Sequence, residues 1–289
     1  MQMQDLYMQY KGLMFKLAYQ LTGSVADAED AVQDVFIKAY NVPPEQLTEP
    51  KAYLCKMVTN RCKDLLKSAR KKREQYFGEW LPEPYLASND NSMESVVRDD
   101  LLSYGMLVML EKLSPSERAV FVLREALGFE YSEISELIEK SEVSCRKFFS
   151  RARAKMGLQF EYPVHPQAES QQWIHEFLGA LKQGNMNQLL SLLDKDVILV
   201  SDGGGKVLAA VEPIKTREHV ARFLLGPVRN LATIGEEIAI ELVQFNGQPA
   251  IVIRSQEGVI HTVGLFHIQG DLIHNVYFVR NPDKLNHVG

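Results

Sequence analysis

Residues 113–156, LSPSERAVFVLREALGFEYSEISELIEKSEVSCRKFFSRARAKM, decide how the middle of the chain folds. Helix signals divide this segment into three short helices. Ser114 and Glu117 have the spacing of a capping box, and Pro115 fits the first helical position, so the first helix begins here. We expect it to end at Gly128, because glycine readily adopts the left-handed conformation found just beyond a helix.

The last two helices of this segment are predicted to form a helix-turn-helix. Ser132 is expected to cap the first of them, and the second begins near Ser141. Apolar residues on the second helix recur at helical spacing and predict one buried stripe: Cys145, Phe148, Phe149, Ala152 and Met156. The opposite face is basic and has no acid after Glu142. This pattern is typical of a helix that enters the major groove of DNA, and the alternative is a solvated basic helix on another bundle.

The exposed face of this helix supplies the candidates for contact with duplex DNA. Basic side chains bind phosphates and base edges, and hydroxyl groups hydrogen-bond to either. The candidates are Ser144, Arg146, Lys147, Ser150, Arg151 and Arg153. Because the first turns of a recognition helix usually enter the groove, Arg146 is predicted to contact a base and Arg153 to contact phosphate.

The overall charge limits how the chain can bind nucleic acid. The chain has 289 residues and a formal net charge of −5, so it is not a polybasic coat protein. DNA contact must therefore come from two local basic patches, residues 56–73 and 146–155. Hydrophobic residues make up 46% and charged residues 24%, which is ordinary for globular domains, and the length allows two or three of them.

Several sequence features favour a reduced, cytoplasmic protein. The N-terminal sequence MQMQDLYMQY lacks the pattern of a secretory signal, and no apolar run approaches the ~20 residues of a membrane helix. Cys55, Cys62 and Cys145 lie on predicted helical faces, and their odd number and spacing suggest neither a disulfide framework nor a zinc site. We expect no metal, no cofactor and no membrane contact.

The chain is predicted to contain two helical modules followed by an α+β domain. Residues 1–75 form the first module, with an amphipathic helix over 2–22, a helix capped by Ser24 and a long helix starting at Pro50. Residues 76–98 are a linker rich in proline and aromatic residues, and 99–158 form the second module. In 167–289 the spacing of apolar residues changes from helical to alternating, and helices are followed by several strands. This order predicts a curved antiparallel sheet over helices. Its predicted helices cover 167–184 and 217–231, and its strands lie within 189–214, 238–245, 249–255, 258–268 and 272–280.

Three motifs in residues 1–158 resemble the group IV, extracytoplasmic-function (ECF), sigma factors of bacterial RNA polymerase. They are AEDAVQDVFIKAY (28–40), AYLCKMVTNRCKDLLK (52–67) and SEVSCRKFFSRAR (141–153), in the family's order and spacing. The resemblance implies a domain 2 helical bundle and a domain 4 helix-turn-helix. It also implies that the chain binds the clamp and flap regions of core polymerase, directs promoter-specific initiation and is not an enzyme.

The same resemblance assigns residues to two further surfaces. The helix that docks on the polymerase clamp would use Asp30, Gln33, Asp34 and Phe36. The surface that reads and helps to melt the minus-ten element would use Leu47, Tyr53, Lys56, Asn60 and Arg61. A basic groove with stacking aromatic rings is what capture of a melted strand requires. The alternatives are that Tyr53 belongs to the core and that the lysines are solvated. We expect residues 67–73 to face phosphate or solvent.

The C-terminal domain resembles the SnoaL-like, NTF2-like fold, and an ECF sigma factor with this extension resembles the ECF41 group. Three short strings carry this resemblance: Trp80, Leu81, Pro82, Glu83 and Pro84; Asp202, Gly203, Gly204, Gly205 and Lys206; and Asn281, Pro282, Asp283, Lys284 and Leu285. It implies that the domain regulates the sigma modules in cis, in place of a separate anti-sigma factor. Each string also has an alternative interpretation. The first could be a rigid extended spacer, the second a tight glycine turn, and the third a helix-start or turn segment.

A second class of function remains open for the C-terminal domain. SnoaL-like folds enclose a pocket, so the domain could be a small-molecule sensor or a cyclase-like or isomerase-like enzyme. His261 and His267 lie on one face of a strand if that strand is regular, and Asp202 and Asp271 are available carboxylates. Because turn chemistry explains both aspartates, we identify no catalytic acid–base pair. A plain helix-turn-helix repressor is disfavoured by the polymerase-docking helix.

Overall fold

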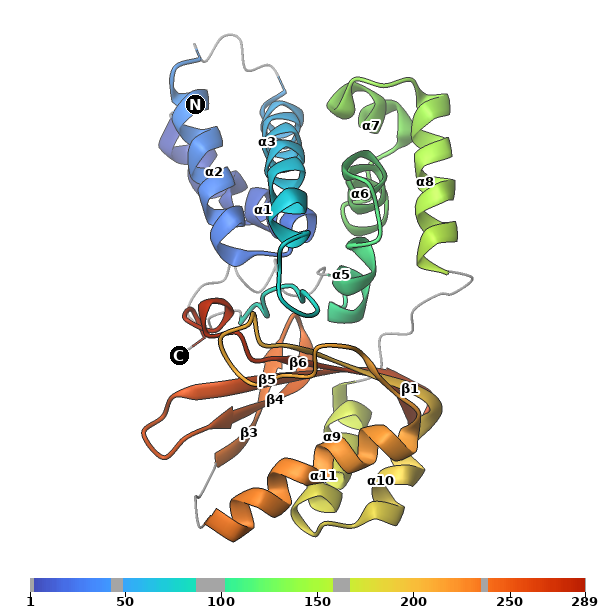
Figure 1. Cartoon of the computed structure of the whole chain (residues 1–289). Helices are drawn as coiled ribbons and strands as arrows, with labels where there is room; N and C mark the ends of the chain where they lie inside the picture. The colour runs from blue at the N-terminus through green and yellow to red at the C-terminus, as the bar shows by residue number, and fades with distance from the viewer. Residues whose placement is uncertain (1–2, 43–48, 87–101, 158–166, 235–238, 289) are drawn as a thin grey trace. The chain divides into compact units, whose positions relative to one another are not determined.

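A computed structural model describes residues 3–42, 49–86, 102–157, 167–234 and 239–288 of the chain. The chain divides into two compact units (Figure 1). Unit 1 combines Met1–Gln75 with Ala87–Glu161, and unit 2 combines Tyr76–Leu86 with Tyr162–Gly289. The described part of the predicted linker, 76–86, therefore belongs to the same compact unit as the C-terminal domain.

The first half of unit 1 is a bundle of three helices, as predicted. They are α1 (Met3–Thr22), α2 (Val25–Tyr40) and α3 (Pro50–Arg73). Ser24 is the N-cap of α2, because its hydroxyl accepts a hydrogen bond from the backbone N–H of Asp27 at 3.1 Å. The three helices meet through buried apolar side chains that include Leu17, Val32, Leu54 and Val58.

The second half of unit 1 contains the helix-turn-helix. Its helices are α5 (Tyr104–Leu110), α6 (Pro115–Phe121), the π-helical turn η2 (Val122–Ala126), α7 (Tyr131–Ile138) and α8 (Glu142–Met156). The predicted capping box is present, since Ser114 accepts from the Glu117 N–H and the Glu117 carboxylate accepts from the Ser114 N–H at 2.9 Å. Gly128 follows the π-helical turn with a φ of +68°, which explains the glycine there.

The predicted cap of α7 is wrong. Ser132 lies inside the first turn of the helix, and Glu130 occupies the N-cap position. The backbone N–H of Glu130 donates to the Glu133 carboxylate at 2.7 Å, so two glutamates form the capping box in place of a serine. On α8 the predicted stripe is only partly buried: Cys145, Ala152 and Met156 are buried, whereas Phe148 and Phe149 are half-buried.

Unit 2 has the predicted α+β architecture. Its elements are α9 (Gln167–Lys182), α10 (Met186–Leu192), β1 (Leu193–Asp202), β2 (Ile214–Lys215), α11 (Arg217–Ile234), β3 (Ala239–Phe245), β4 (Gln248–Arg254), β5 (Ile260–Gln269), β6 (Leu272–Val279) and the 3-10 turn η3 (Pro282–Lys284). The described strands form one six-stranded sheet in the order β2-β1-β6-β5-β4-β3. Strands β3 to β6 are the predicted antiparallel meander, and β1 pairs in parallel with β6.

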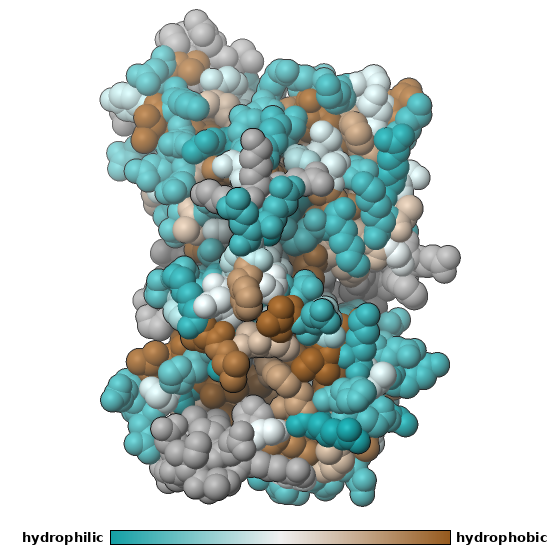
Figure 2. Space-filling view, in the orientation of Figure 1, coloured by the Kyte–Doolittle hydropathy of each residue, from teal (hydrophilic) through white to brown (hydrophobic). Residues whose placement is uncertain are grey.

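The core of unit 2 lies between the sheet and its helices. Figure 1 shows α9, α10 and α11 on one side of the sheet, and Figure 2 shows apolar residues gathered over this part of the molecule. Trp173, Phe177 and Phe266 pack with ring centroids 5.1–5.6 Å apart in this core. Residues 189–192, which lie in a segment predicted to contain strands, belong to α10 because Asn185 caps a helix there.

Two smaller sequence predictions can be compared with the fold. No described helix is long and apolar enough to span a membrane. Cys55, Cys62 and Cys145 are free thiols, and all three are buried. Burial raises the pKa of Cys55 and of Cys62 to about 12, which keeps both thiols protonated at neutral pH.

Candidate functional site

The exposed face of α8 is basic, as the sequence predicts. Ser141 caps the helix by accepting from the Ser144 N–H at 3.3 Å, and Gly157 ends it with a φ of +68°. Figure 2 shows mostly hydrophilic residues along α8. Of the six candidates for DNA contact, Ser144 is half-buried. The other five are exposed: Arg146, Lys147, Ser150, Arg151 and Arg153. The helix can therefore present a row of cations to a phosphate backbone.

Two cations of α8 form ion pairs with carboxylates of the described residues. Arg146 forms an ion pair with Glu142 at 3.3 Å, and its guanidinium carbon lies 4.3 Å from the ring centroid of Tyr131. Lys155 instead forms an ion pair with the buried capping residue Glu117 at 2.7 Å. Burial raises the pKa of Glu117, but hydrogen bonds from Lys155 and from Ser114 outweigh burial, and the net pKa is lowered. Lys155 therefore stabilises the start of α6.

The predicted minus-ten surface lies on α3, and its charged members are paired within unit 1. Tyr53 and Asn60 are half-buried. Lys56 forms an ion pair with Glu139, the residue after α7, at 2.8 Å. Helix α3 also packs against α6 and α7, so the two helical modules share an interface on this side of α3. Leu47, also assigned to this surface, lies outside the described residues.

The predicted polymerase-binding face of α2 is partly exposed. Asp30 and Gln33 are exposed, whereas Asp34 is half-buried and forms an ion pair with Arg61 at 2.8 Å. Phe36 is buried and packs edge-to-face on Tyr7, with ring centroids 4.9 Å apart. The structure therefore places Phe36 in the core of the bundle, because an aromatic ring at this position fills the space between α1 and α2.

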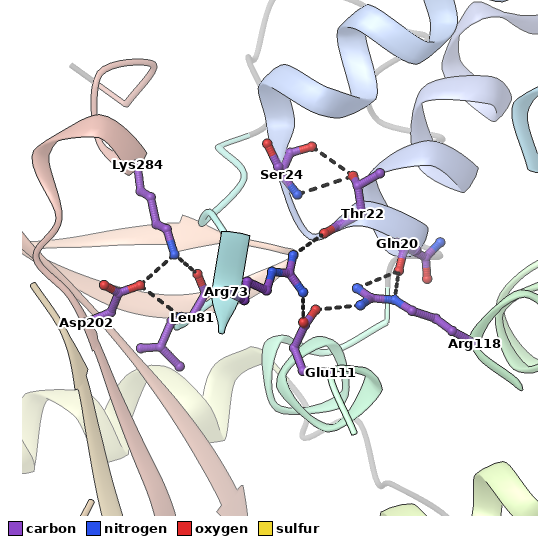
Figure 3. Close-up of polar contacts among 9 residues, drawn as sticks. All are labelled: Gln20, Thr22, Ser24, Arg73, Leu81, Glu111, Arg118, Asp202 and Lys284. Atoms are coloured by element: carbon purple, nitrogen blue, oxygen red, sulfur yellow. Dashed lines mark hydrogen bonds and ion pairs between the residues drawn. The ribbon is translucent and has the colours of Figure 1, made fainter. Parts of the chain in front are cut away.

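A buried cluster of ionic groups joins the two halves of unit 1 (Figure 3). Glu111 forms ion pairs with Arg118, at 2.5 Å, and with Arg73. Arg118 also donates to the Gln20 carbonyl, and Arg73 donates to the Thr22 carbonyl. Burial lowers the pKa of both guanidinium groups, and the Glu111 carboxylate compensates the charges of the buried Arg118 and the half-buried Arg73.

The sequence did not identify this cluster, and it assigned Arg73 to solvent or phosphate. Arg118 is only 2% exposed although it follows a second charged residue, Glu117, in a short helix. Its position on the apolar face of α6 is the one signal that the sequence contained. An arginine at a core position indicates a buried partner, because charged groups are almost never fully buried unless they are paired.

The three strings of the ECF41 resemblance meet at one buried carboxylate in unit 2, that of Asp202 (Figure 3). Asp202 is fully buried at the end of β1. Its Oδ1 atom accepts hydrogen bonds from the Tyr76 hydroxyl at 2.6 Å and from the Gly204 N–H at 3.0 Å. Its Oδ2 atom accepts from the Leu81 N–H at 2.9 Å and from Lys284 Nζ at 2.6 Å. We call Tyr76, Trp80, Leu81, Asp202, Asn281 and Lys284 the linker junction.

Lys284 is the cation of the linker junction. It is 5% exposed, pairs with Asp202 and donates a second hydrogen bond to the Leu81 carbonyl. Its Nζ atom lies 4.0 Å from the ring centroid of Trp80 and 5.2 Å from that of Tyr76. Burial and the hydrogen bond to Asp202 raise the pKa of Tyr76, so its hydroxyl stays a donor. Aromatic rings, a carboxylate and a carbonyl together compensate the buried ammonium group.

The glycines of the second string allow this close approach. Gly204 has a φ of +60°, and a Cβ atom there would lie 2.4 Å from the Asn281 side chain. A Cβ atom on Gly203 would lie 2.4 Å from the Val207 carbonyl oxygen. The string is therefore more than a tight turn, because its glycines let the tail that contains Asn281 reach the end of β1.

The remaining contacts of the strings lie around the linker junction, and Pro282 is exposed. Asn281 donates to the Tyr76 hydroxyl at 2.8 Å, and its backbone N–H donates to the Asp202 carbonyl at 2.9 Å. Lys206 and Asp283 form an exposed ion pair at 2.6 Å. Glu83 is half-buried, Gly205 follows Gly204 in the same turn, and three apolar members are buried: Pro82, Pro84 and Leu285.

The acid–base alternative finds no support in the described strands. Asp202 is engaged in the linker junction, and His261 is exposed at a β-bulge between β4 and β5. His267 is half-buried, lies 3.1 Å from Asn275 Oδ1 and precedes a second bulge between β5 and β6. The strand is not regular, so the condition for placing the two histidines on one face is not met.

Two family models match the helical unit. The model for Sigma-70 region 2 matches residues 6–72, and the model for Sigma-70, region 4 matches residues 106–156. The first match covers the α1–α3 bundle, and the second runs from α5 to the end of α8. The two halves of unit 1 therefore define the chain as a sigma factor by their folds and by their order.

Similar proteins cover nearly the whole chain. The ECF RNA polymerase sigma factor SigJ of Mycobacterium tuberculosis is 30% identical over 283 residues, which are 94% of this chain and 89% of that protein. Its crystal structure has a TM-score of 0.77 at 27% identity and covers 96% of both chains. A SnoaL-like protein from Burkholderia thailandensis covers 40% of this chain and 97% of its own, with 18% identity and a TM-score of 0.32.

The chain belongs to the ECF RNA polymerase sigma factors. The prediction made from the three helical motifs is confirmed. As a member of this family, the chain is a transcription initiation factor that binds core RNA polymerase and promoter DNA, and it is not an enzyme.

Proposed function

We propose that this sigma factor reads a two-element promoter and that its C-terminal domain controls this reading in cis through the linker junction. Helix α8 would contact the upstream duplex element through Arg146, Lys147 and their neighbours. Helix α3 would contact the melted element through Tyr53, Lys56 and Asn60. The observation that carries the regulatory part is the buried Asp202 carboxylate, which binds both the linker and the C-terminal tail.

The linker junction is well suited to control the spacing of the two DNA-reading modules. Tyr76 follows the last residue of α3, Arg73, by three positions in the chain. Near the end of the described linker residues, 76–86, Tyr85 and Asn246 exchange two hydrogen bonds, at 2.9 and 3.1 Å. The C-terminal domain therefore binds residues 76–85 at both ends, and holding or releasing them would change the separation of the two modules.

The ion pair between Lys56 and Glu139 supports a regulated state. It links a residue of the proposed minus-ten surface to the residue after α7 in the region 4 module. DNA phosphate and Glu139 would compete for the same ammonium group. Release of the linker would allow the two modules to separate and Lys56 to bind DNA, and a few kcal/mol between the two states suffices for such a switch.

Transcription assays with matched variants test this regulation. The template is a promoter selected in vitro from a random DNA pool with the wild-type holoenzyme. Removal of residues 281–289 deletes Lys284, and Trp80→Ala removes the ring that faces it. We expect both variants to change run-off transcription in the same direction while circular dichroism shows that the helical unit stays folded.

The matched control is Lys206→Ala, which breaks only the exposed ion pair with Asp283. It should transcribe like the wild-type protein. If the truncated chain and Trp80→Ala also transcribe like the wild type, and Trp80 fluorescence reports a solvent-exposed indole, the proposal of control through these contacts is wrong.

The polymerase-contact proposal concerns the exposed stripe of α2. Asp30, Gln33 and Asp34 would bind the clamp, while the region 4 module would bind the flap. Asp34→Lys should weaken the affinity for core polymerase, but this variant also loses the ion pair with Arg61. The double variant Asp34→Lys, Arg61→Glu restores an intramolecular pair with reversed charges. If the double variant binds core polymerase like the wild type, Asp34 acts only through Arg61.

A small-molecule ligand in the C-terminal domain is the second candidate function. Among the described residues, Trp173 has a buried indole N–H without a hydrogen-bond partner, and a ligand acceptor could satisfy it. Phe177 and Phe266 pack directly beside this indole. Native mass spectrometry of the purified full-length protein tests for a retained ligand, and Trp173→Phe should then lower its occupancy.

A further inference from the structure

Five side chains form a continuous row from the π-helical turn η2 to helices α7 and α8, and Arg146 is one of them. Glu130 forms an ion pair with Arg124 at 2.9 Å. The guanidinium carbon of Arg124 lies 5.1 Å from the ring centroid of Tyr131, and that of Arg146 lies 4.3 Å from the same centroid. Glu142 completes the row through its ion pair with Arg146 at 3.3 Å. One aromatic ring therefore has two cations as neighbours, and each cation has its own carboxylate.

This row holds the guanidinium group of Arg146 from two directions. A cation within about 6 Å of an aromatic centroid is attracted by the ring, and Tyr131 meets this criterion. Glu142 holds the same group from one turn earlier on α8. The ring is itself braced, because Tyr131 packs edge-to-face on Phe149 with a centroid distance of 6.1 Å.

Arg146 remains available to a partner although it is held. Its side chain is 60% exposed, so the ring and the carboxylate cover only part of it. Bidentate binding to guanine requires a defined orientation of the guanidinium plane. An arginine that is oriented before binding loses less conformational freedom on binding than a free one.

We propose that Tyr131 is a positioning residue that orients Arg146 for contact with one base pair of the upstream element, and that it thereby sets specificity at that base pair. This inference rests on the proposed function of α8. Arg153 offers a contrast on the same helix: its guanidinium carbon lies 6.0 Å from the Phe149 ring, at the limit of such attraction. A loosely held cation suits phosphate, which needs charge more than orientation.

The test measures base preference rather than affinity alone. Holoenzymes assembled from core polymerase and full-length wild type, Tyr131→Leu, Tyr131→Phe or Arg146→Ala select binding sites from a duplex pool randomised in the upstream element. We expect Arg146→Ala to abolish the preference at one base pair. Tyr131→Leu should lower the preference at that same base pair about two- to fivefold, and Tyr131→Phe should retain it because the ring is kept.

The double variant Tyr131→Leu, Arg146→Ala should show no loss beyond that of Arg146→Ala, since Tyr131 acts through Arg146. If Tyr131→Leu does not fold, Glu142→Gln removes the other support without changing the core. It should lower the same preference while the affinity for unrelated DNA is kept or increased.

The outcomes separate the two levels of the proposal. If Arg146→Ala leaves every base preference unchanged, the base contact proposed for α8 is wrong. If Arg146→Ala abolishes one preference but Tyr131→Leu and Glu142→Gln keep it at the wild-type level, α8 reads DNA and the positioning role of Tyr131 is wrong. An equal loss for Tyr131→Leu and Tyr131→Phe would also contradict it, because the ring would not be the feature that matters.

Discussion

The linker junction and helix α8 contain the same kinds of basic side chain in opposite environments. Lys284 is 5% exposed and surrounded by a carboxylate, a carbonyl and two rings. Arg146 keeps a 60% exposed side chain beside one carboxylate and one ring. Removing a buried cation's partner is costly, whereas exposed cations contribute little to folding and are available to another molecule. The comparison predicts stability effects at the junction and binding effects on α8.

The largest effect is expected from Asp202→Ala. It leaves the Lys284 ammonium group buried without its carboxylate, which should lower the free energy of unfolding of unit 2 by about 3–5 kcal/mol. Urea denaturation followed by tryptophan fluorescence measures this selectively, because both tryptophans, Trp80 and Trp173, belong to unit 2. A loss below about 1 kcal/mol would mean that the pair is solvated in solution.

Tyr76→Phe removes one hydrogen-bond donor from the Asp202 carboxylate. It should lower the free energy of unfolding of unit 2 by about 1.5–3 kcal/mol. The pKa of Tyr76 is raised in the folded protein, first by burial and then by Asp202. The stability that the neutral hydroxyl contributes is therefore complete below its ordinary pKa near ~10 and declines as the pH rises through the folded value. Unfolding measured from pH 8 upward should show this decline in the wild type and a smaller one in Tyr76→Phe.

On α8 the prediction reverses. Arg146→Ala should change the free energy of unfolding by less than about 0.5 kcal/mol. It should, however, reduce the difference in binding free energy between the correct and the wrong base pair at one position by about 1–3 kcal/mol. Arg153→Ala should weaken binding to all sequences and reduce the salt slope by about one unit. Fluorescence anisotropy with holoenzyme and promoter duplex at several salt concentrations measures both. Equal, sequence-independent effects would show that Arg146 contacts only phosphate.

The smallest effect is expected from Lys206→Ala, which lies in the same string as Asp202. The side chains of Lys206 and Asp283 are 53% and 61% exposed. Loss of their ion pair should therefore lower the free energy of unfolding by between 0 and about 1 kcal/mol. The same urea titration compares it directly with Asp202→Ala. If the two variants lose similar stability, burial does not distinguish the two ion pairs, and the comparison between buried and exposed cations fails.

The sequence predicted elements best where local signals and tertiary packing agree. Ser24 and Ser114 cap the helices that were assigned to them, and α8 begins next to Ser141 as expected, because a cap needs only its own first turn. The cap at Ser132 was wrong, since Glu130 and Glu133 form a competing box two residues earlier. The helix α10 was missed because its run of leucines fits a buried strand equally well.

The candidate sites divide in the same way. The exposed row on α8 could be predicted, because helical periodicity alone separates its basic face from Cys145, Ala152 and Met156. The cluster of Arg73, Glu111 and Arg118 could not, because its members come from three elements whose packing no local pattern specifies. Tyr76 was also missed, since its only signal was an aromatic residue at the start of the linker.

The sequence by itself determined the family, the order of the modules, the helix-turn-helix and the three strings of the C-terminal extension. These depend on periodicity, caps and motifs, which act over a few residues. Only the tertiary structure decided that Asp202, Leu81 and Lys284 meet, and that Asp202 is the buried partner of a cation as well as a turn residue. The physical reason is that the cost of burying a charge depends on which groups the fold brings around it, and those groups lie up to 203 residues apart in the chain.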